Sequence, residues 1–330
     1  MELLLFALIP LAALVLDLVV GEPPNKFHPV VWMGKVIGFF DEHVSRKNQR
    51  HDRLCGVFVS LLPIIIFTLA FTLILGAVRI YGGEYGLLIW AILCALLFST
   101  LFAIKSLGTH TLPIMKDLQN HDLEAARKKA AMVVSRDVNK LDEAHVISCA
   151  SETVAENLVD SVLSPMFYFG LAGIPGATIL RVANTEDGMI GYLSEKHQNV
   201  GRFAAKLDDV LHYLTARLSV PFIMLASALL GYDWRSAWRV AKRDHQQTSS
   251  PNKGWPMAAI AGALGIKMEK EGHYSLGDGE LGNDPANIAQ TVRLMRYTSL
   301  LFFIIVLLPL YLLIGLHVQL FLENYLFGLF

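Results

Sequence analysis

Three long uncharged stretches constrain this chain of 330 residues more than any other feature. They are residues 54–78, 85–104 and 297–322, and none of them contains Asp, Glu, Lys or Arg. A helix of roughly 20 apolar residues crosses a bilayer core, so each stretch is long enough to span a membrane. A fourth apolar stretch, 3–20, contains Asp17. It lacks the basic region and cleavage site of a signal peptide, so we expect a retained first span.

Two further segments leave the number of crossings open. Segment 161–180 is uncharged but carries two prolines and three glycines, and segment 218–232 has only 15 residues. Each is either another crossing or a segment that dips into the membrane against other helices. We therefore predict an all-α, polytopic integral membrane protein with four clear transmembrane helices, two ambiguous membrane segments and helical cytoplasmic loops. We expect residues 1–330 to form a single membrane-embedded unit.

The distribution of basic residues predicts which loops lie in the cytoplasm. Loop 21–53 contains six Lys and Arg residues, segment 105–160 contains seven and segment 233–296 contains nine. Basic loops favour the cytoplasmic side, so we expect these three regions there and the N-terminus outside. The 28 basic and 29 acidic residues of the whole chain nearly cancel, which excludes a basic nucleic-acid-binding protein.

An acidic block precedes the first ambiguous segment. Glu152, Glu156 and Asp160 are spaced four residues apart, so on a helix they form one stripe. The stripe is either a solvated acidic face or a site for a metal ion or substrate. Because it runs directly into an apolar segment, where carboxylates are costly, we favour the second interpretation. Hard cations such as Mg²⁺ prefer carboxylate oxygens, so we predict these three residues as metal ligands.

Polar residues also follow the first ambiguous segment and recur before the second. Asn184 and Asp187 lie about one helical turn apart, with Thr185 between them. This cluster is either part of a site or a polar turn with a side-chain cap. Asp208 and Asp209 are adjacent. Neighbouring residues point in different directions on a helix, so at most one of the two faces a given site.

A polar loop precedes a helix of small residues near position 250. Its members are Ser250, Pro251, Asn252, Lys253, Gly254 and Trp255. Hydroxyl, amide and backbone N–H groups near a helix start can bind phosphate, and a lysine adds positive charge. The loop lacks the spacing of a P-loop. The alternative is a plain turn followed by a closely packed helix.

One histidine stands out after the first span. His28 follows a proline-rich turn, and it is either a proton-transfer group or ligand, or part of a helix-terminating turn. Nothing in the sequence requires bound haem, flavin or nicotinamide.

Taken in order, these motifs resemble the adenosylcobinamide-phosphate synthase family of cobalamin biosynthesis. The resemblance runs from about residue 10 to about residue 265. It rests on the residues around Asp17 and His28, on Arg136-Asp137 with the block 151–160, and on later signatures at 184–192, 205–218 and 250–265. One departure is the polar stretch 269–274, where we expect the family to be shorter and aromatic-rich.

The resemblance implies an enzyme of the prokaryotic inner membrane. It would join adenosylcobyric acid to (R)-1-aminopropan-2-ol phosphate, or to free aminopropanol, in an ATP-dependent and Mg²⁺-dependent amide synthesis. Other late cobalamin-pathway enzymes are candidate partners. The alternatives are a signalling relative without synthase activity and a transporter, which would show an inverted repeat that the sequence lacks.

For such a reaction, the carboxylate cluster motivates a hypothesis about the roles of individual residues. Asp187, Asp208 and Asp209 are the predicted catalytic residues, with Asp187 near the metal and one of the other two as proton acceptor. The predicted substrate-binding and phosphate-binding residues are His28, Arg136, Asp137, Asn157, Asn184, Thr185, Ser250, Pro251, Asn252, Lys253, Gly254 and Trp255.

Overall fold

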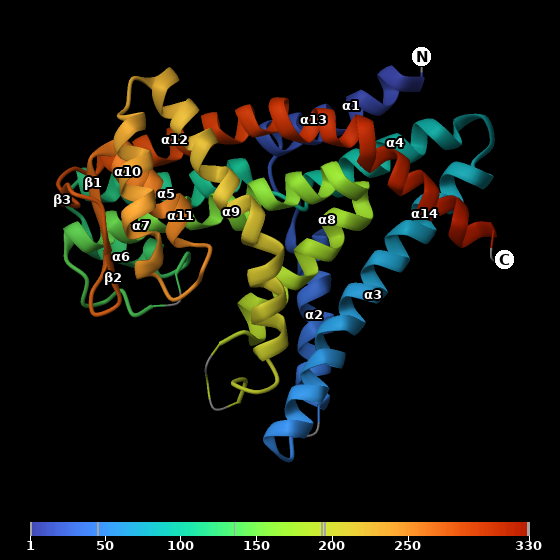
Figure 1. The fold of residues 1–330 in the computed structure, drawn as a ribbon, viewed down its shortest axis with the longest axis horizontal. Coiled ribbons are helices and arrows are strands. Elements are labelled where there is room, and N and C mark those ends of the chain that lie inside the picture. Colours follow the sequence, from blue (N-terminus) through green and yellow to red (C-terminus); the bar gives the residue numbers. More distant parts are fainter. Residues whose placement is uncertain (1, 45, 135, 193, 195, 329–330) are drawn as a thin grey trace. The chain divides into compact units, whose positions relative to one another are not determined.

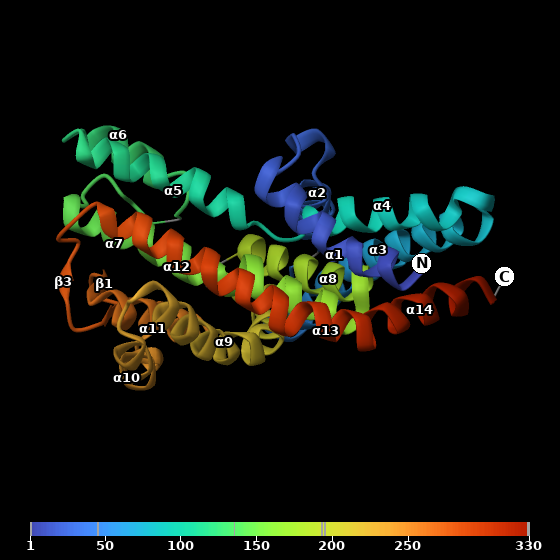
Figure 2. The same ribbon diagram turned by 90° about the horizontal axis from the view of Figure 1, so that it is seen from above.

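The described part of the chain is almost entirely helical (Figures 1 and 2). It forms two compact units, each made of more than one stretch of chain. The first unit comprises Met1–Ala103, Ser164–Leu211 and Phe303–Phe330, and the second comprises Ile104–Leu163 and His212–Phe302. The all-α prediction is confirmed, and the single-unit organisation stays a prediction. This computed structural model describes residues 2–44, 46–134, 136–192, 194 and 196–328.

The first unit contains most of the apolar helices. Within it α1 packs against α4, and α3 packs against both α4 and α8. The long helix α3 begins where the Asn48 side chain accepts a hydrogen bond from the His51 N–H, which caps one of the otherwise unpaired helix-start donors. The helices of this unit are α1 (Glu2–Val19), α2 (Pro29–His43), α3 (Gln49–Tyr81), α4 (Gly86–Ser99), α8 (Ser164–Ile190), the first part of α9 (Arg202–Leu230), α13 (Leu308–Leu310) and α14 (Leu316–Gly328).

The second unit carries the polar helices and the three described strands. Its core includes Ile114, Leu118, Val146 and Ile288, all fully or almost fully buried. The strands form one small sheet in the order β2-β1-β3, which lies beside α7 and α11. The elements are α5 (Ile104–Gln119), α6 (Leu123–Ala130), α7 (Glu143–Leu158), the last part of α9, α10 (Trp234–Asp244), α11 (Gly254–Leu264), β1 (Ile266–Lys270), β2 (Tyr274–Leu276), β3 (Glu280–Leu281) and α12 (Ala286–Phe302).

Five helical segments are long and apolar enough to cross a membrane, so the chain is a multi-pass membrane protein. Three of them contain the predicted spans 54–78, 85–104 and 297–322, one contains the ambiguous segment 161–180, and one covers 218–230 of the ambiguous segment 218–232. The fourth predicted span, 3–20, is not among the five. The N-terminal apolar helix Leu4–Val19 is shorter than these five. The five segments are Gln49–Tyr81, Gly83–Gln119, Glu143–Ile190, Arg202–Leu230 and Ala286–Gly328.

The first ambiguous segment contains a break in α8. Ala172 and Gly173 leave the helical conformation, and Gly173 has a φ of 61° that favours glycine. The Ile174 N–H, which the break releases from the helix, donates a hydrogen bond of 3.0 Å to Gln319 Oε1. A Cβ atom on Gly173 would lie 2.0 Å from that same oxygen. Glycine leaves space for the Gln319 side chain, and α14 thereby supplies the hydrogen-bond acceptor that the Ile174 N–H lacks within its own helix.

A buried polar network continues from Gln319 within the first unit. Gln319 Nε2 donates to Glu323 Oε1 at 3.0 Å, and Trp90 Nε1 donates to the same oxygen at 2.9 Å. Arg79 Nε donates to Glu323 Oε2 at 2.6 Å. Glu323 is fully buried, so its charge is compensated by a cation and two neutral donors. The network ties α3, α4 and α14 together.

Gln319→Leu is expected to destabilise the protein by about 1–3 kcal/mol, because the Ile174 N–H loses its acceptor and Glu323 loses a donor. The midpoint of unfolding in detergent measures the effect. His317→Leu, an exposed change on the same helix, is the matched control and should leave the midpoint unchanged. Equal midpoints for Gln319→Leu and the parent protein would contradict this account of the helix break.

A second cluster of polar side chains stabilises the C-terminal end of α2 within the same unit. Asp41 accepts hydrogen bonds from Arg46 Nη2 at 2.6 Å, Lys196 Nζ at 2.6 Å and His197 Nε2 at 3.2 Å. Burial acts to raise the pKa of Asp41, but the hydrogen bonds from Lys196 and His197 outweigh it and hold the pKa below its usual value.

The Asp41 cluster is expected to stabilise the fold above about pH 4, the usual pKa range of an unfolded aspartate. Its contribution should be lost as pH falls through the lower pKa of the folded state, because protonation removes the charge that binds the cations. The check is the unfolding midpoint between pH 6 and pH 3. Asp41→Asn should flatten this profile, and a parallel profile for the variant would contradict the prediction.

Candidate active site

The predicted acidic block lies on α7, a helix that begins with a side-chain cap. Asp142 Oδ1 accepts a hydrogen bond from the His145 N–H at 2.9 Å, which satisfies a donor at the helix start. The helix ends at Leu158 and continues as a π-helical segment, Val159–Leu163. Asp160 lies in that segment, so the stripe predicted for an uninterrupted α-helix changes pitch at its last member.

Glu152 is held by three donors from three parts of the second unit. Arg136 Nη2 donates to Oε2 at 2.8 Å, Tyr274 Oη donates to the same oxygen at 2.6 Å, and Ser148 Oγ donates to Oε1 at 2.6 Å. Burial acts to lower the pKa of Arg136, but the Glu152 carboxylate outweighs it and raises the pKa. Arg136 is thus a permanently charged group anchored beside the acidic face.

Glu156 and Lys253 form the next ion pair along this face. Lys253 Nζ lies 2.6 Å from Glu156 Oε1, and each side chain is about one-third exposed. Lys253 immediately precedes α11. The pair therefore brings the predicted phosphate-binding loop against the predicted acidic block. Its partial exposure leaves the ammonium accessible to a ligand.

Asp160 lies near a buried histidine at the far end of the acidic face. His212 Nδ1 is 3.8 Å from Asp160 Oδ1, and only 1% of the histidine side chain is exposed. The face thus presents an arginine, a lysine and a histidine against three carboxylates. All of these residues belong to the second unit.

The loop before α11 has a defined conformation. Arg217 Nη1 donates to Asn252 Oδ1 at 3.1 Å, and the Arg217 guanidinium also lies 5.5 Å from the ring centre of Trp255. The Trp255 ring stacks on His245. A Cβ atom on Gly254 would lie 2.1 Å from the His245 carbonyl oxygen, so only glycine fits this close approach. These contacts hold the loop in one defined conformation.

The remaining members of the loop take part in its own hydrogen bonds. The Asn252 N–H donates to Ser250 Oγ at 3.3 Å, and the Ser250 carbonyl accepts from Thr248 Oγ1 at 2.9 Å. The Pro251 carbonyl accepts from Arg217 Nη2 at 3.4 Å. These bonds fix the turn that places Lys253 against α7.

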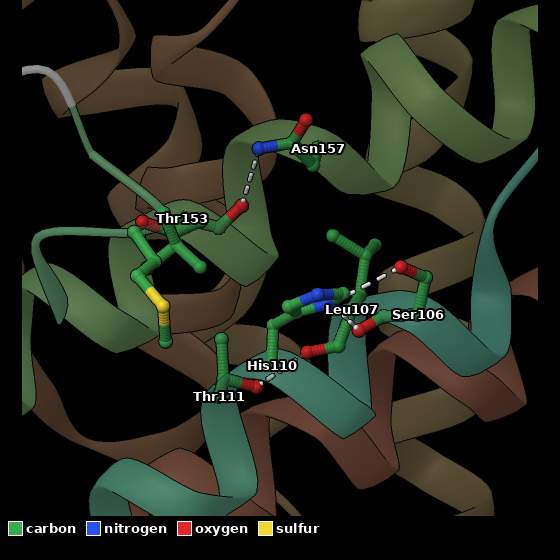
Figure 3. A pocket seen from close by; sticks show the side chains of 8 residues that line it. Ser106, Leu107, His110, Thr111, Thr153 and Asn157 are labelled. Carbon is green, nitrogen blue, oxygen red and sulfur yellow. Dashed lines mark hydrogen bonds between the residues drawn. The ribbon is translucent and has the colours of Figure 1, made fainter. Parts of the chain in front are cut away.

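A small pocket lies on the neighbouring side of α7. Its volume is about 220 Å³. Figure 3 shows side chains of α5 and α7 on either side of it, with Asn157 Nδ2 donating to the Thr153 carbonyl at 2.9 Å. Asn157 is therefore the one predicted site residue that lines this pocket. The lining residues are Ser106, Leu107, His110, Thr111, Met132, Val133, Thr153 and Asn157.

Asp137 performs a local role in the segment before α7. Its Oδ1 atom accepts a hydrogen bond from the Asn139 N–H at 3.0 Å, and the residue is exposed. This contact stabilises a turn and gives no sign of a ligand. The predicted binding role of Asp137 stays a prediction.

A second set of predicted residues belongs to the first unit. Asn184 Nδ2 donates to Asp208 Oδ1 at 3.3 Å, so the structure joins α8 to α9 through two predicted residues. Thr185 Oγ1 donates to the Arg181 carbonyl one turn earlier in its own helix. Asp187 and Asp209 are partly buried.

His28 is the other predicted residue of the first unit. Its Nδ1 atom accepts a hydrogen bond of 3.2 Å from the Val30 N–H and caps the start of α2. Burial lowers the pKa of His28, which favours the neutral ring that such a cap requires. The capping geometry supports the helix-terminal interpretation, and a ligand role stays a prediction.

Whether the acidic block could bind Mg²⁺ depends on which of its carboxylates already have hydrogen-bond or ion-pair partners. Mg²⁺ is usually held by one or two carboxylates together with water and substrate phosphates. Within the described residues, no group of three His, Cys, Asp or Glu side chains could hold a metal ion. Three donors occupy Glu152, Glu156 is paired with Lys253, and Asp160 lies near His212. The three-ligand metal site stays a prediction.

Several residues of the site escaped the sequence analysis. Tyr274 contacts Glu152 across 122 positions of sequence, and it lies in the stretch that departs from the family pattern. Arg217 and His212 belong to α9 but gave no motif of their own. In the first unit, Glu186 of α8 is fully buried and was also not singled out. A glutamate inside an apolar helix was the available signal.

The family model described as CobD/Cbib protein matches residues 10–295. The chain belongs to this family. A relative named "Probable cobalamin biosynthesis protein CobD" from Methanothermobacter thermautotrophicus is 40% identical over 292 residues, which cover 88% of this chain and 94% of the relative. No solved structure matches the chain.

Two further members of the family have similar coverage. "Cobalamin biosynthesis protein CobD" from Dehalococcoides mccartyi is 39% identical over 84% of this chain and 88% of the relative. "Probable cobalamin biosynthesis protein CobD" from Thermococcus kodakarensis is 38% identical over 92% of this chain and 96% of the relative. The family assignment therefore covers both units, and the predicted family resemblance is confirmed.

Proposed function

We propose that this chain is an adenosylcobinamide-phosphate synthase. It joins the free carboxylate of adenosylcobyric acid to the amine of (R)-1-aminopropan-2-ol phosphate as an amide, with ATP as cosubstrate and Mg²⁺ as cofactor. The observation that carries the proposal is the Glu156–Lys253 pair beside the Arg136–Glu152 pair. Together the pairs place two cations and an accessible carboxylate on one face of the second unit. Membership of a cobalamin-biosynthesis family supports the choice of substrates.

A carboxylate needs activation before an amine can displace one of its oxygens. In the proposed first step a carboxylate oxygen attacks the γ-phosphorus of ATP, which forms an acyl phosphate and releases ADP. In the second step the amine attacks the acyl carbon, the C–N bond forms, and inorganic phosphate leaves. The protein supplies positioning and charge neutralisation for such a phosphoryl transfer.

Residues of the second unit fit these requirements. Lys253 and Arg136 would contact phosphate oxygens, and Ser250 and Asn252 hold the loop that positions Lys253. Mg²⁺ held by Glu156 and Asp160 would neutralise further phosphate charge. Glu152 fixes the direction of Arg136 through the 2.8 Å contact.

Residues of the first unit are proposed for the rest of the substrate. The hydrogen-bonded pair Asn184 and Asp208, together with Thr185, offers amide, hydroxyl and carboxylate groups for the polar side chains of a corrinoid. The catalytic roles predicted for Asp187, Asp208 and Asp209 stay predictions.

We also propose that the polar regions face the cytoplasm, where ATP is available, as their basic residues indicate. Labelling of Lys140→Cys in a cysteine-free background tests this orientation. A membrane-impermeant maleimide should label the variant in inverted inner-membrane vesicles and leave it unlabelled in intact cells.

The reaction is tested by mass spectrometry of the detergent-purified protein with adenosylcobyric acid, aminopropanol phosphate, ATP and Mg²⁺. Adenosylcobinamide phosphate should form and should disappear when ATP is omitted. A parallel reaction with free aminopropanol identifies the preferred amine. A folded protein that yields neither product would contradict the proposed function.

A further inference from the structure

The pocket between α5 and α7 is too small for most of the proposed substrates. Its volume is about 220 Å³. Sites that enclose drug-sized molecules begin at about 300 Å³, so this pocket is smaller than a site that would enclose ATP or a corrinoid. A three-carbon amino alcohol is of suitable size. The pocket is therefore matched to the small substrate or to part of it.

The hydroxyl groups of the pocket are arranged as hydrogen-bond acceptors. Thr111 Oγ1 donates its proton to the Leu107 carbonyl at 2.6 Å, and Thr153 Oγ1 donates to the Cys149 carbonyl at 2.9 Å. A hydroxyl has one proton and two lone pairs, so each oxygen presents acceptor capacity once its proton is committed. Both threonines are buried.

The contacts of His110 fix which ring nitrogen carries the proton. His110 Nδ1 lies 2.8 Å from the Ser106 carbonyl and 3.2 Å from Ser106 Oγ (Figure 3). A carbonyl only accepts, so Nδ1 bears the proton in this hydrogen bond. In the neutral ring Nε2 then carries the lone pair. His110 is thereby prepared to accept a proton at Nε2.

The residues that line the pocket favour a ligand with N–H groups over an anion. None of the described residues that line the pocket is Asp, Glu, Lys or Arg. Acceptor oxygens and a basic nitrogen attract an N–H-bearing group and repel a phosphate.

The pocket lies next to the face of α7 where the proposed chemistry would take place. Thr153 and Asn157 directly follow Glu152 and Glu156 on α7. Successive residues of a helix point about 100° apart, so the pocket and the acidic face occupy neighbouring sides of the same helix. An amine in the pocket is thus next to the face proposed to activate the carboxylate.

We propose that this pocket binds the primary amine of the amino-alcohol substrate and that His110 Nε2 takes its proton. This inference rests on the proposed synthase function. The ammonium R–NH₃⁺ transfers one proton to Nε2, and the resulting R–NH₂ uses its lone pair to attack the acyl phosphate. The C–N bond forms and phosphate leaves. The amide keeps one of the two remaining N–H protons, and the other leaves with the phosphate as HPO₄²⁻. His110 thus replaces Asp208 and Asp209 as the catalytic proton acceptor.

Binding is measured first, by titration of the full-length protein in detergent without ATP or corrinoid. The probes are (R)-1-aminopropan-2-ol phosphate and propan-2-yl phosphate, which lacks the amine. The parent protein should bind the amine probe about tenfold more tightly than the amine-free probe. Thr153→Val should abolish this preference while leaving the affinity for propan-2-yl phosphate unchanged. An unchanged preference in Thr153→Val would overturn the proposal.

Catalysis is measured second, with His110→Gln and the matched control His273→Gln, an exposed histidine of the same unit. His110→Gln should lower kcat by about 100-fold or more, and His273→Gln should leave it unchanged. Imidazole added to His110→Ala should restore part of the rate, which a purely structural role would not allow. Unchanged kcat in His110→Gln, or an equal fall in Asp208→Asn with imidazole rescue absent, would overturn the proton-acceptor role.

The two measurements separate this inference from the function on which it rests. If the parent protein forms no amide but retains the amine preference, the proposed reaction fails and the pocket assignment stands. If the amide forms while every pocket variant behaves as the parent does, the pocket assignment fails and the reaction stands.

Discussion

Lys253→Met is expected to lower the rate of amide synthesis by about 100-fold to 1,000-fold, the effect typical of losing one group that stabilises developing charge. Lys253 Nζ is held 2.6 Å from Glu156 and remains partly exposed, so it has both a fixed position and access to phosphate. Methionine resembles the apolar part of the lysine side chain and removes the charge. The measurement is the initial rate of product formation at saturating ATP.

Two comparisons make the result specific. Lys128→Met removes an exposed lysine from α6 in the same unit and should leave the rate unchanged. Glu156→Gln should also lower the rate, because it removes a carboxylate proposed to share Mg²⁺ with phosphate. A Lys253→Met variant that is folded and as active as the parent would show that the acidic face of α7 is not the site of phosphoryl transfer.

Glu152→Ala is expected to destabilise the second unit by about 3–5 kcal/mol, the cost of breaking a buried ion pair by removing one partner. The change leaves the Arg136 guanidinium without its carboxylate and removes the acceptor of Tyr274 and Ser148. Thermal unfolding in detergent, together with amide hydrogen exchange along α7, measures the loss.

Smaller changes at the same place should cost less. Tyr274→Phe removes one donor and is expected to cost about 1 kcal/mol. The double variant Arg136→Met with Glu152→Met removes both charges and should recover part of the stability lost in Glu152→Ala. Unfolding of Glu152→Ala at the parent midpoint would contradict the anchoring role assigned to Glu152.

The membrane character of the fold followed directly from composition. Long uncharged stretches have few alternatives to a membrane helix, so the spans at 54–78, 85–104 and 297–322 are contained in segments that the structure shows to be long and apolar. The prolines and glycines around Gly173 indicated that the helix could be interrupted there. Its partner Gln319 was not predictable, because the hydrogen bond joins positions 145 residues apart.

The sequence indicated which residue types make up the candidate site, but not which residue contacts each carboxylate. Sequence spacing grouped Glu152, Glu156 and Asp160, but the π-helical segment at Val159–Leu163 leaves no mark in hydropathy. The structure gives each carboxylate a different neighbour, of which Arg136 and Lys253 had been singled out and His212 had not. His110 was missed because its significance depends on hydrogen bonds that fix a tautomer.

The most direct test of the proposed chemistry is an isotope-transfer experiment. Adenosylcobyric acid labelled with ¹⁸O in its free carboxylate is incubated with ATP, Mg²⁺, aminopropanol phosphate and the purified protein, and the released phosphate is examined by mass spectrometry. An acyl phosphate route predicts one ¹⁸O atom in inorganic phosphate for each amide formed. Label in AMP, unlabelled phosphate beside product, or no product at all would contradict the account.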